Sequence, residues 1–180
     1  MTVSFYEEKG RKYCKIDDVV FGKLSIRYPE QKYGSTEKIF RAECIVNKAD
    51  YKEIKKKLKK SSFEEIDTAV FEGRLRFAPP YPDQDEQFVV RFSAKTTYKD
   101  KKTGEQKPLE DGMELRPKIF EVMEDGSNVE ITKVKYINNG SKGSIILSVS
   151  EVELEKEKVV LGFLKAVYLT EVNEYIKPTE

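Results

Sequence analysis

The chain has 180 residues, of which 38% are hydrophobic and 36% are charged, and it contains no histidine. Its 33 basic and 32 acidic residues give a net charge of +1, so overall charge does not by itself drive binding to nucleic acid. The lack of histidine excludes catalysis by Ser-His-Asp or Cys-His groups and removes the commonest zinc ligand.

This length predicts one domain spanning residues 1–180, with terminal extensions at roughly 1–18 and 176–180. The longest apolar runs are shorter than the ~20 residues of a membrane helix, and the first residues lack the order of a signal peptide. We therefore expect a cytoplasmic protein without membrane contact. Cys14 and Cys44 are expected to be buried, reduced thiols, with a disulfide or a reactive thiol as the alternatives.

Alternation of apolar and polar residues, the pattern of a half-buried strand, recurs along most of the chain. It is clearest where Phe88, Val90 and Phe92 face one way and Arg91 faces the other. Segments rich in Gly and Pro separate these runs and are predicted to be loops, the longest at 79–87 and 97–112. In chain order, the predicted strands are residues 19–28, 39–46, 69–77, 88–98, 115–123, 129–136, 144–154 and 159–172.

One helix is well marked between the second and third of these strands. Asn47 is suited to cap a helix over 48–60, in which Tyr51, Ile54 and Leu58 recur at helical spacing. The lysines around this apolar stripe are predicted to form a solvated face. A second short helix or turn is expected near 62–67. Many strands with one clear helix predict a mainly β protein, as a closed or nearly closed antiparallel barrel, with a β-sandwich as the alternative.

A turn rich in Gly, Asn and Ser leads into the strand at 144–154 and carries Lys142. Glycine lets a ligand approach the main chain, and N–H groups beside a lysine suit an anion such as a phosphate. No P-loop, dinucleotide-binding or metalloprotease motif accompanies this turn. We therefore predict no enzyme activity, no cofactor and no metal, with a magnesium site made of carboxylates as the remaining possibility.

Basic side chains alternate along several of the predicted strands. A general binder of single-stranded nucleic acid needs a basic groove with aromatic platforms for unstacked bases. An arginine on a strand is more often a surface residue or an ion-pair partner than a ligand. The prediction therefore rests on the alternation that several strands share. Tyr168 alternates with Leu164 and Ala166 and is assigned to the core. The predicted DNA-binding residues are Arg27, Tyr28, Tyr33, Arg41, Arg74, Arg76, Arg91, Lys95, Arg116, Lys118, Phe120 and Lys142.

Taken in order, the segments 88–95, 116–121, 136–149 and 162–175 resemble the single-stranded-DNA-binding proteins of tailed bacteriophages. The resemblance covers about residues 22–175 and implies an oligonucleotide/oligosaccharide-binding (OB) fold. It implies that 116–118 and 139–143 line or shape the nucleic-acid face. It also implies that the chain binds single-stranded DNA. Phage replication or recombination proteins are implied as further partners, and a homodimer is implied as well. The implied location is the cytoplasm of the infected host.

The chain departs from this class at its end, because 174–180 is short and mixed in charge where such proteins often carry an acidic tail. Tail-mediated recruitment is thus in doubt. The sequence predicts a non-catalytic, sequence-tolerant single-stranded-DNA-binding protein acting in phage DNA replication, recombination or repair. The alternative is a protein-interaction or virion component on a similar β-barrel, and a nuclease built on carboxylates is the least supported.

Overall fold

The computed structural model describes residues 2–31, 34, 37–59, 62–110, 112–132, 137 and 139–173. Within these residues the chain is mainly β with two α-helices, which confirms the predicted class. The elements are β1 (Val3–Glu8), β2 (Arg11–Gln31), β3 (Lys38–Val46), α1 (Lys48–Lys57), β4 (Ser62–Asp67), α2 (Thr68–Leu75), β5 (Glu86–Lys95), β6 (Thr97–Lys99), β7 (Gln106–Pro108), β8 (Lys118–Val122), β9 (Asn128–Glu130), β10 (Ser141–Leu154) and β11 (Glu157–Glu171).

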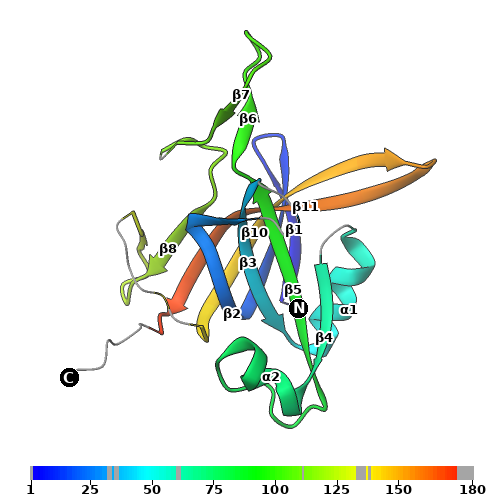
Figure 1. The fold of residues 1–180 in the computed structure, drawn as a ribbon, viewed down its shortest axis with the longest axis vertical. Helices are drawn as coiled ribbons and strands as arrows, with labels where there is room; N and C mark the ends of the chain where they lie inside the picture. Colours follow the sequence, from blue (N-terminus) through cyan, green and yellow to red (C-terminus); the bar gives the residue numbers. More distant parts are fainter. Residues whose placement is uncertain are drawn as a thin grey trace.

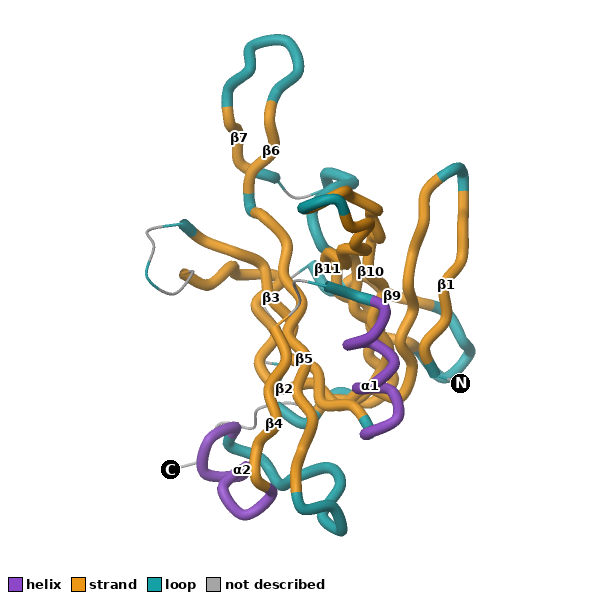
Figure 2. The backbone as a smooth tube through the Cα atoms, turned by 90° about the vertical axis from the view of Figure 1, so that its right-hand side faces the viewer, coloured by secondary structure: helices purple, strands orange, loops and turns teal. Residues whose placement is uncertain are grey.

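Nine of the described strands form one sheet, in the order β4-β5-β3-β2-β10-β11-β8-β9 with β1 paired to β2. The sheet curls so that β11 lies against β5 across the core, and its pairs are antiparallel except for β11 with β8. In the described part of the chain no ladder joins β9 to β4, so the predicted closed barrel is not confirmed. The short β6–β7 hairpin projects from one end of the molecule, and α2 lies at the other end (Figures 1 and 2).

The curled sheet encloses the main core, which α1 covers on one side. Phe21, Phe40 and Phe92 are among its fully buried side chains. Asn47 caps α1 as predicted, with its side-chain oxygen accepting a hydrogen bond from the Asp50 N–H at 2.8 Å. The predicted apolar stripe of this helix, Tyr51, Ile54 and Leu58, is buried in that core.

Both cysteines are buried and free, as the sequence predicts. Burial raises the pKa of the Cys14 thiol to about 12, against a smaller lowering effect of Lys57. At neutral pH this thiol is therefore protonated and behaves as a small apolar side chain.

The sequence prediction is wrong for the segment after α1. Residues 62–67 form strand β4 rather than a helix or turn. The predicted strand at 69–77 falls mostly in helix α2, which ends at Leu75. Phe71 and Leu75 are four residues apart, a spacing that fits both a strand of period two and a helix of period 3.6. Two interactions favour the helix. The Asp67 side chain caps it by accepting a hydrogen bond from the Ala69 N–H at 3.0 Å. Phe71 and Leu75 are also buried against Ile45 and Val89.

Two further segments differ from the predictions. The expected loop at 97–112 contains the β6–β7 hairpin, in which Tyr98 pairs with Lys107. The first 18 residues, expected as an extension, belong largely to the sheet, because β1 pairs with β2 over its whole length. Consequently β2 is a single long strand that reaches from the β1 hairpin to β3.

Gly143 sets how closely β10 and β11 approach each other. A Cβ atom at this position would overlap the main-chain carbonyl oxygen of Tyr168. We predict that Gly143→Ala lowers the free energy of unfolding by about 3 kcal/mol, because a backbone atom of a paired strand cannot move aside.

Thermal or urea unfolding measures this effect, with Gly73→Ala as the matched control. Gly73 lies in α2 with open space around its Cβ position, so alanine there should be neutral or add up to about 1 kcal/mol of stability. Equal stabilities for the two variants would contradict the close approach.

Candidate nucleic-acid interface

The predicted arginines of β3 and β5 do share the face of the sheet that points away from the main core. Cross-strand partners lie on the same face, and the register pairs Arg41 with Ser93 and Glu43 with Arg91. Arg91 is nevertheless only 12% exposed and lies between two carboxylates. Its Nε is 2.9 Å from Glu43 Oε2, and its Nη1 is 2.9 Å from Glu64 Oε1.

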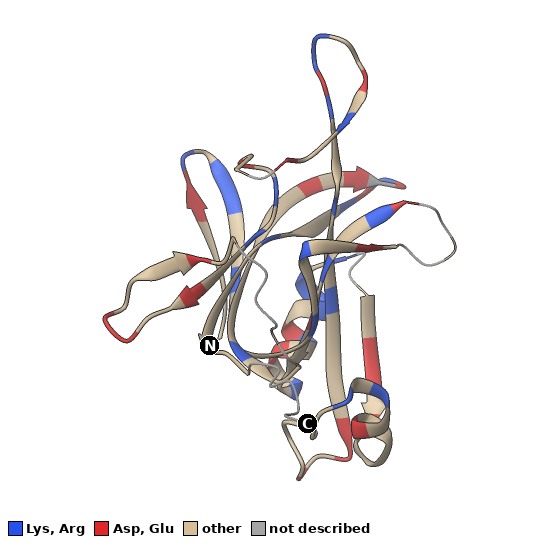
Figure 3. Cartoon of the chain, turned by 60° about the vertical axis from the view of Figure 1, so that its left-hand side comes forward, with Lys and Arg blue, Asp and Glu red and all other residues tan. Residues whose placement is uncertain are grey.

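The neighbouring cations on this face are paired in the same way. Glu30 binds Arg41 Nη1 at 3.2 Å and Lys23 Nζ at 3.1 Å, and Glu64 also binds Arg74 Nη2 at 3.0 Å. Burial alone would raise the pKa of Glu64, but hydrogen bonds from Arg91 and Arg74 outweigh it and lower that pKa. The β3–β5 face is therefore a mixed network of charges, and Figure 3 shows acidic positions interspersed among basic ones along the chain.

Arg116 and Lys118 are engaged with main-chain carbonyls. Arg116 donates to the carbonyls of Leu109 at 3.1 Å and Arg27 at 3.0 Å, and its guanidinium lies 5.0 Å from the centre of the Phe40 ring. Lys118 Nζ donates to the carbonyl of Met113 at 3.1 Å. Arg116 thus links Leu109 to β2, and Lys118 links Met113 to β8.

The remaining predicted residues are spread over the molecule. Tyr28 on β2 is 66% exposed, and Lys95 lies exposed at the end of β5. Arg74 and the exposed Arg76 lie on and after α2, near the opposite end of β5, and not on a strand as predicted. Tyr33 lies outside the described residues. The predicted cations therefore do not lie together on one surface of the sheet. Their part in DNA binding stays a prediction.

The Gly/Ser turn uses its polar groups within the protein. The Gly140 N–H donates to the Phe21 carbonyl at 2.7 Å, and the Asn139 side chain donates to the Leu75 carbonyl at 2.8 Å. Ser141 Oγ accepts from the Asn173 N–H at 2.8 Å. These bonds tie the start of β10 to β2, to α2 and to the end of β11, so these particular groups are not held open for an anion.

A different arrangement lies on the outer face of β1, β2, β10, β11 and β8. Ser148 of β10 pairs with Tyr13 on one side and with Phe163 on the other, and Tyr13 pairs with Tyr6. Four residues away on the same side of β10, Ser144 pairs with Tyr168, which pairs with Phe120. We call these five rings the aromatic track: Tyr6, Tyr13, Phe120, Phe163 and Tyr168.

Four of the five rings of the aromatic track form two contact pairs, and the rings remain partly open to solvent. The Tyr6 and Tyr13 centroids are 5.4 Å apart, and Phe120 lies parallel to Tyr168 with centroids 4.8 Å apart. Tyr6 is 36% exposed and Phe163 is 43% exposed. The track therefore presents flat apolar surface rather than closed core.

Cations border the aromatic track. Lys165 Nζ lies 5.3 Å from the centre of the Tyr13 ring, and a hollow of about 450 Å³ beside this ring is lined by residues that include Arg11, Ser148 and Lys165. Burial and then the Glu8 carboxylate raise the pKa of both Tyr6 and Tyr168. Tyr6 and Tyr168 are thus neutral at physiological pH, which suits them for stacking.

The sequence prediction assigned Tyr168 to the core, and it did not include Tyr6, Tyr13 or Phe163 among the DNA-binding residues. A β-bulge between Leu164 and Ala166 shifts the alternation of β11. Leu164 therefore faces the core beside Leu147, whereas Tyr168 faces outward beside Ser144. Only the pairing of strands far apart in sequence brings these rings together, so no local signal could have found them.

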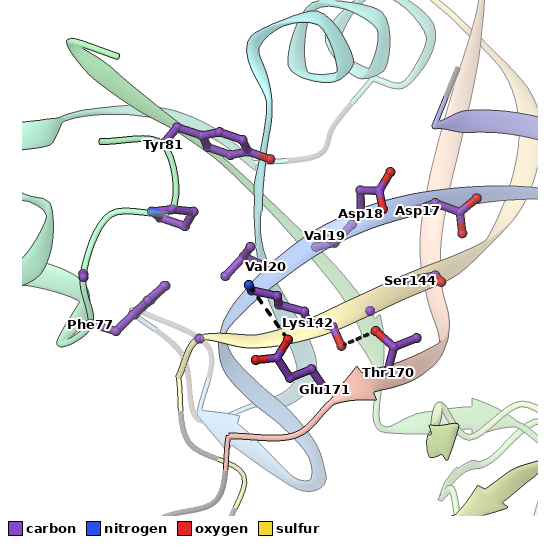
Figure 4. Close-up of a pocket in the computed structure, with 14 residues that line it drawn as sticks. Asp17, Asp18, Val19, Val20, Phe77, Tyr81, Lys142, Ser144, Thr170 and Glu171 are labelled. Carbon is purple, nitrogen blue, oxygen red and sulfur yellow. Dashed lines mark hydrogen bonds and ion pairs between the residues drawn. The ribbon is translucent and has the colours of Figure 1, made fainter. Parts of the chain in front are cut away.

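The outer face continues into a groove of about 860 Å³ at the start of β10. Figure 4 shows Phe77 and Tyr81 on one side of this groove, and Asp18, Lys142, Ser144 and Glu171 on the other. Lys142 Nζ is 3.9 Å from Glu171 Oε2, so the predicted Lys142 is exposed and loosely paired. Because Ser144 also pairs with Tyr168, the groove lies next to the Tyr168 end of the aromatic track.

The described residues contain no cluster of three or more side chains suited to hold a metal ion and no helix long and apolar enough to cross a membrane. No protein-family model and no curated protein sequence matches this chain. A solved structure with a TM-score above 0.5 shares its fold. The single-stranded DNA-binding protein gp2.5 encoded by bacteriophage T7 is 14% identical, with a TM-score of 0.53 over 93% of this chain and 98% of that one. The single-stranded DNA-binding protein from bacteriophage Enc34, in complex with ssDNA, is 13% identical, with a TM-score of 0.46 over 94% of each chain.

The Arg91 network makes a testable contribution to stability. We predict that Arg91→Met lowers the free energy of unfolding at pH 7 by about 3 kcal/mol, because it leaves two partly buried carboxylates without their shared cation. The lowered pKa of Glu64 means that its contribution is present at neutral pH and is lost as the carboxylate becomes protonated in acid. The deficit of the variant should therefore shrink between pH 7 and about pH 4.

Urea unfolding at several pH values measures this deficit. Arg74→Ala is the control, because Arg74 is half exposed and binds the same Glu64. This control should cost at most about 1 kcal/mol. A deficit of Arg91→Met that is independent of pH would show that lost packing, rather than charge, is responsible.

Proposed function

We propose that this chain binds single-stranded DNA with little dependence on sequence and without catalysis. The observation that carries the proposal is the aromatic track, which lies on the open outer face of a sheet. The fold matches that of T7 gp2.5, which is named as a single-stranded DNA-binding protein, and this likeness supports the same conclusion.

Stacking supplies the affinity in this proposal. Unpaired bases stack on aromatic side chains with about 1–3 kcal/mol per base, and every base has a flat face to offer. Tyr13 and Phe163 flank Ser148 in one cross-strand row. Tyr168 lies further along β11, beside Ser144 of β10, and Phe120 lies next to it on β8. A strand that follows β10 would therefore meet rings at two successive levels.

Phosphates are expected to make a limited contribution. Lys165 and Lys142 lie at the two ends of the outer face, and Arg11 borders the Tyr13 end. The arginines of β3 and β5 are neutralised by carboxylates. We therefore expect binding to depend on salt, with a slope set by these few cations.

The wider setting is proposed from the same resemblance. The fold is proposed to be a complete OB-type barrel. The chain is proposed to act in phage DNA replication, recombination or repair, in the cytoplasm of an infected bacterium. It is further proposed to contact phage replication or recombination proteins and to form a homodimer. Binding of single-stranded DNA by one domain requires neither the phage setting, nor partner proteins, nor a dimer.

The second candidate is a protein-interaction or virion component on the same scaffold. One observation favours it, since Arg41, Arg74 and Arg91 are all satisfied within the protein by ion pairs. Binding to oligo-dT separates the two candidates, because an interaction module has no reason to bind it.

The first test titrates the protein with oligo-dT of about 12 nucleotides and follows tyrosine emission, which no tryptophan obscures. We expect saturable quenching, and a log–log salt slope of about −0.7 for each phosphate neutralised. Duplex of the same length should bind less tightly, because its bases cannot stack on the track. No binding at low salt would overturn the proposal.

The second test removes single rings. Tyr13→Ala and Phe163→Ala should each weaken oligo-dT binding by about fivefold to a hundredfold, which corresponds to one lost stacking contact. Tyr6→Ala should weaken it as well, because Tyr6 supports the Tyr13 ring.

Phe5→Ala is the matched control. Phe5 precedes Tyr6 on the same strand and is similarly exposed at 41%, but it pairs with the buried Cys14 and therefore points to the opposite face. Its ring lies 5.2 Å from Lys57 Nζ. If Phe5→Ala reduced affinity as much as Tyr6→Ala, the DNA could not be assigned to the outer face.

A further inference from the structure

The groove in Figure 4 has the features of a base-binding subsite at the end of the aromatic track. Its volume, about 860 Å³, is within the usual range of small-ligand sites. Ser144 lines the groove and is also the cross-strand partner of Tyr168. The groove therefore lies beside the Tyr168 end of the track, within reach of a strand bound there.

The aromatic wall of this groove is held in place by a buried polar side chain. Gln87 is fully buried, and it binds the main chain of Tyr81 twice. Its Oε1 accepts from the Tyr81 N–H at 3.1 Å, and its Nε2 donates to the Tyr81 carbonyl at 2.7 Å. The same Nε2 donates to Thr68 Oγ1 at 2.9 Å, which links the wall to the start of α2. Because its main chain is fixed in this way, the loop holds the Tyr81 ring at a defined position in the groove.

The opposite wall carries hydrogen-bond acceptors. Asp18 is exposed at a bulge of β2 and lines the groove across from Tyr81 (Figure 4). Burial is the main cause that raises the pKa of Tyr81, and the charges of Asp50 and then Asp18 add to it. Asp17 is held by Lys15 at 3.6 Å, and Glu171 is loosely paired with Lys142. A carboxylate repels phosphate and accepts from an amine, so this wall suits the edge of a base rather than the backbone.

We propose that this groove binds one base of the single strand between Tyr81 and Asp18, and that it prefers bases with an exocyclic amine. The inference rests on the proposed single-stranded DNA binding and adds a preference to it. Cytosine offers an N4 amine donor where thymine offers the O4 acceptor, so a carboxylate distinguishes the two pyrimidines directly. The five rings of the aromatic track are expected to stack on bases of any type.

Competition between oligo-dC and oligo-dT of about 12 nucleotides at neutral pH tests the inference. The chain should bind oligo-dC about fivefold or more tightly than oligo-dT. Asp18→Asn should remove the preference, because an amide offers both a donor and an acceptor and can therefore pair with either base. The change is otherwise mild, since asparagine tolerates the positive φ of 55° at this position.

Glu72→Gln is the control for the loss of one negative charge. Glu72 is exposed on α2 and does not line the groove, so this variant should keep the preference for oligo-dC. Equal binding of the two oligonucleotides by the unaltered chain would overturn the base preference while leaving single-stranded DNA binding intact. A preference that survived Asp18→Asn would also overturn it. Failure to bind either oligonucleotide would overturn the proposed function and this inference together.

Discussion

The register of β10 between β2 and β11 is the constraint on which the rest of the structure depends. In this register Ser148 stands between Tyr13 and Phe163, and Leu147 stands between Cys14 and Leu164. A slip of one residue would exchange the faces, placing rings in the core and aliphatic side chains in solvent. The bulges in β2 and β11 and the close approach at Gly143 fix this register.

Local patterns predicted the elements whose surroundings are simple. The alternation of β3 and β5 and the Asn47 cap of α1 could be read directly, because one face of each meets the same core. α2 could not be read, because Phe71 and Leu75 fit two periods and only packing against Ile45 and Val89 decides between them. The face of Tyr168 was also beyond a local reading, because a bulge reverses the alternation of β11.

The charged residues illustrate a second limit of sequence reasoning. Arg41 and Arg91 lie on the face that alternation predicts, but their partners Glu30 and Glu64 come from other strands. A pattern of cations along one strand therefore does not reveal whether the face is positive. In this chain the ion pairs link β2, β3, β4 and β5. The flat surface suited to bases lies on β1, β8, β10, β11 and the first part of β2.

Stacking and charge thus occupy different parts of the same curled sheet, which explains how a chain of net charge +1 can be suited to a polyanion. The most direct measurement is photochemical cross-linking to oligo-dT, followed by mass spectrometry of the linked peptides. Peptides that contain Tyr13, Phe163 or Tyr168 should carry the nucleotide. Cross-links confined to β3 and β5, or absent altogether, would contradict the central claim that the outer aromatic surface receives the bases.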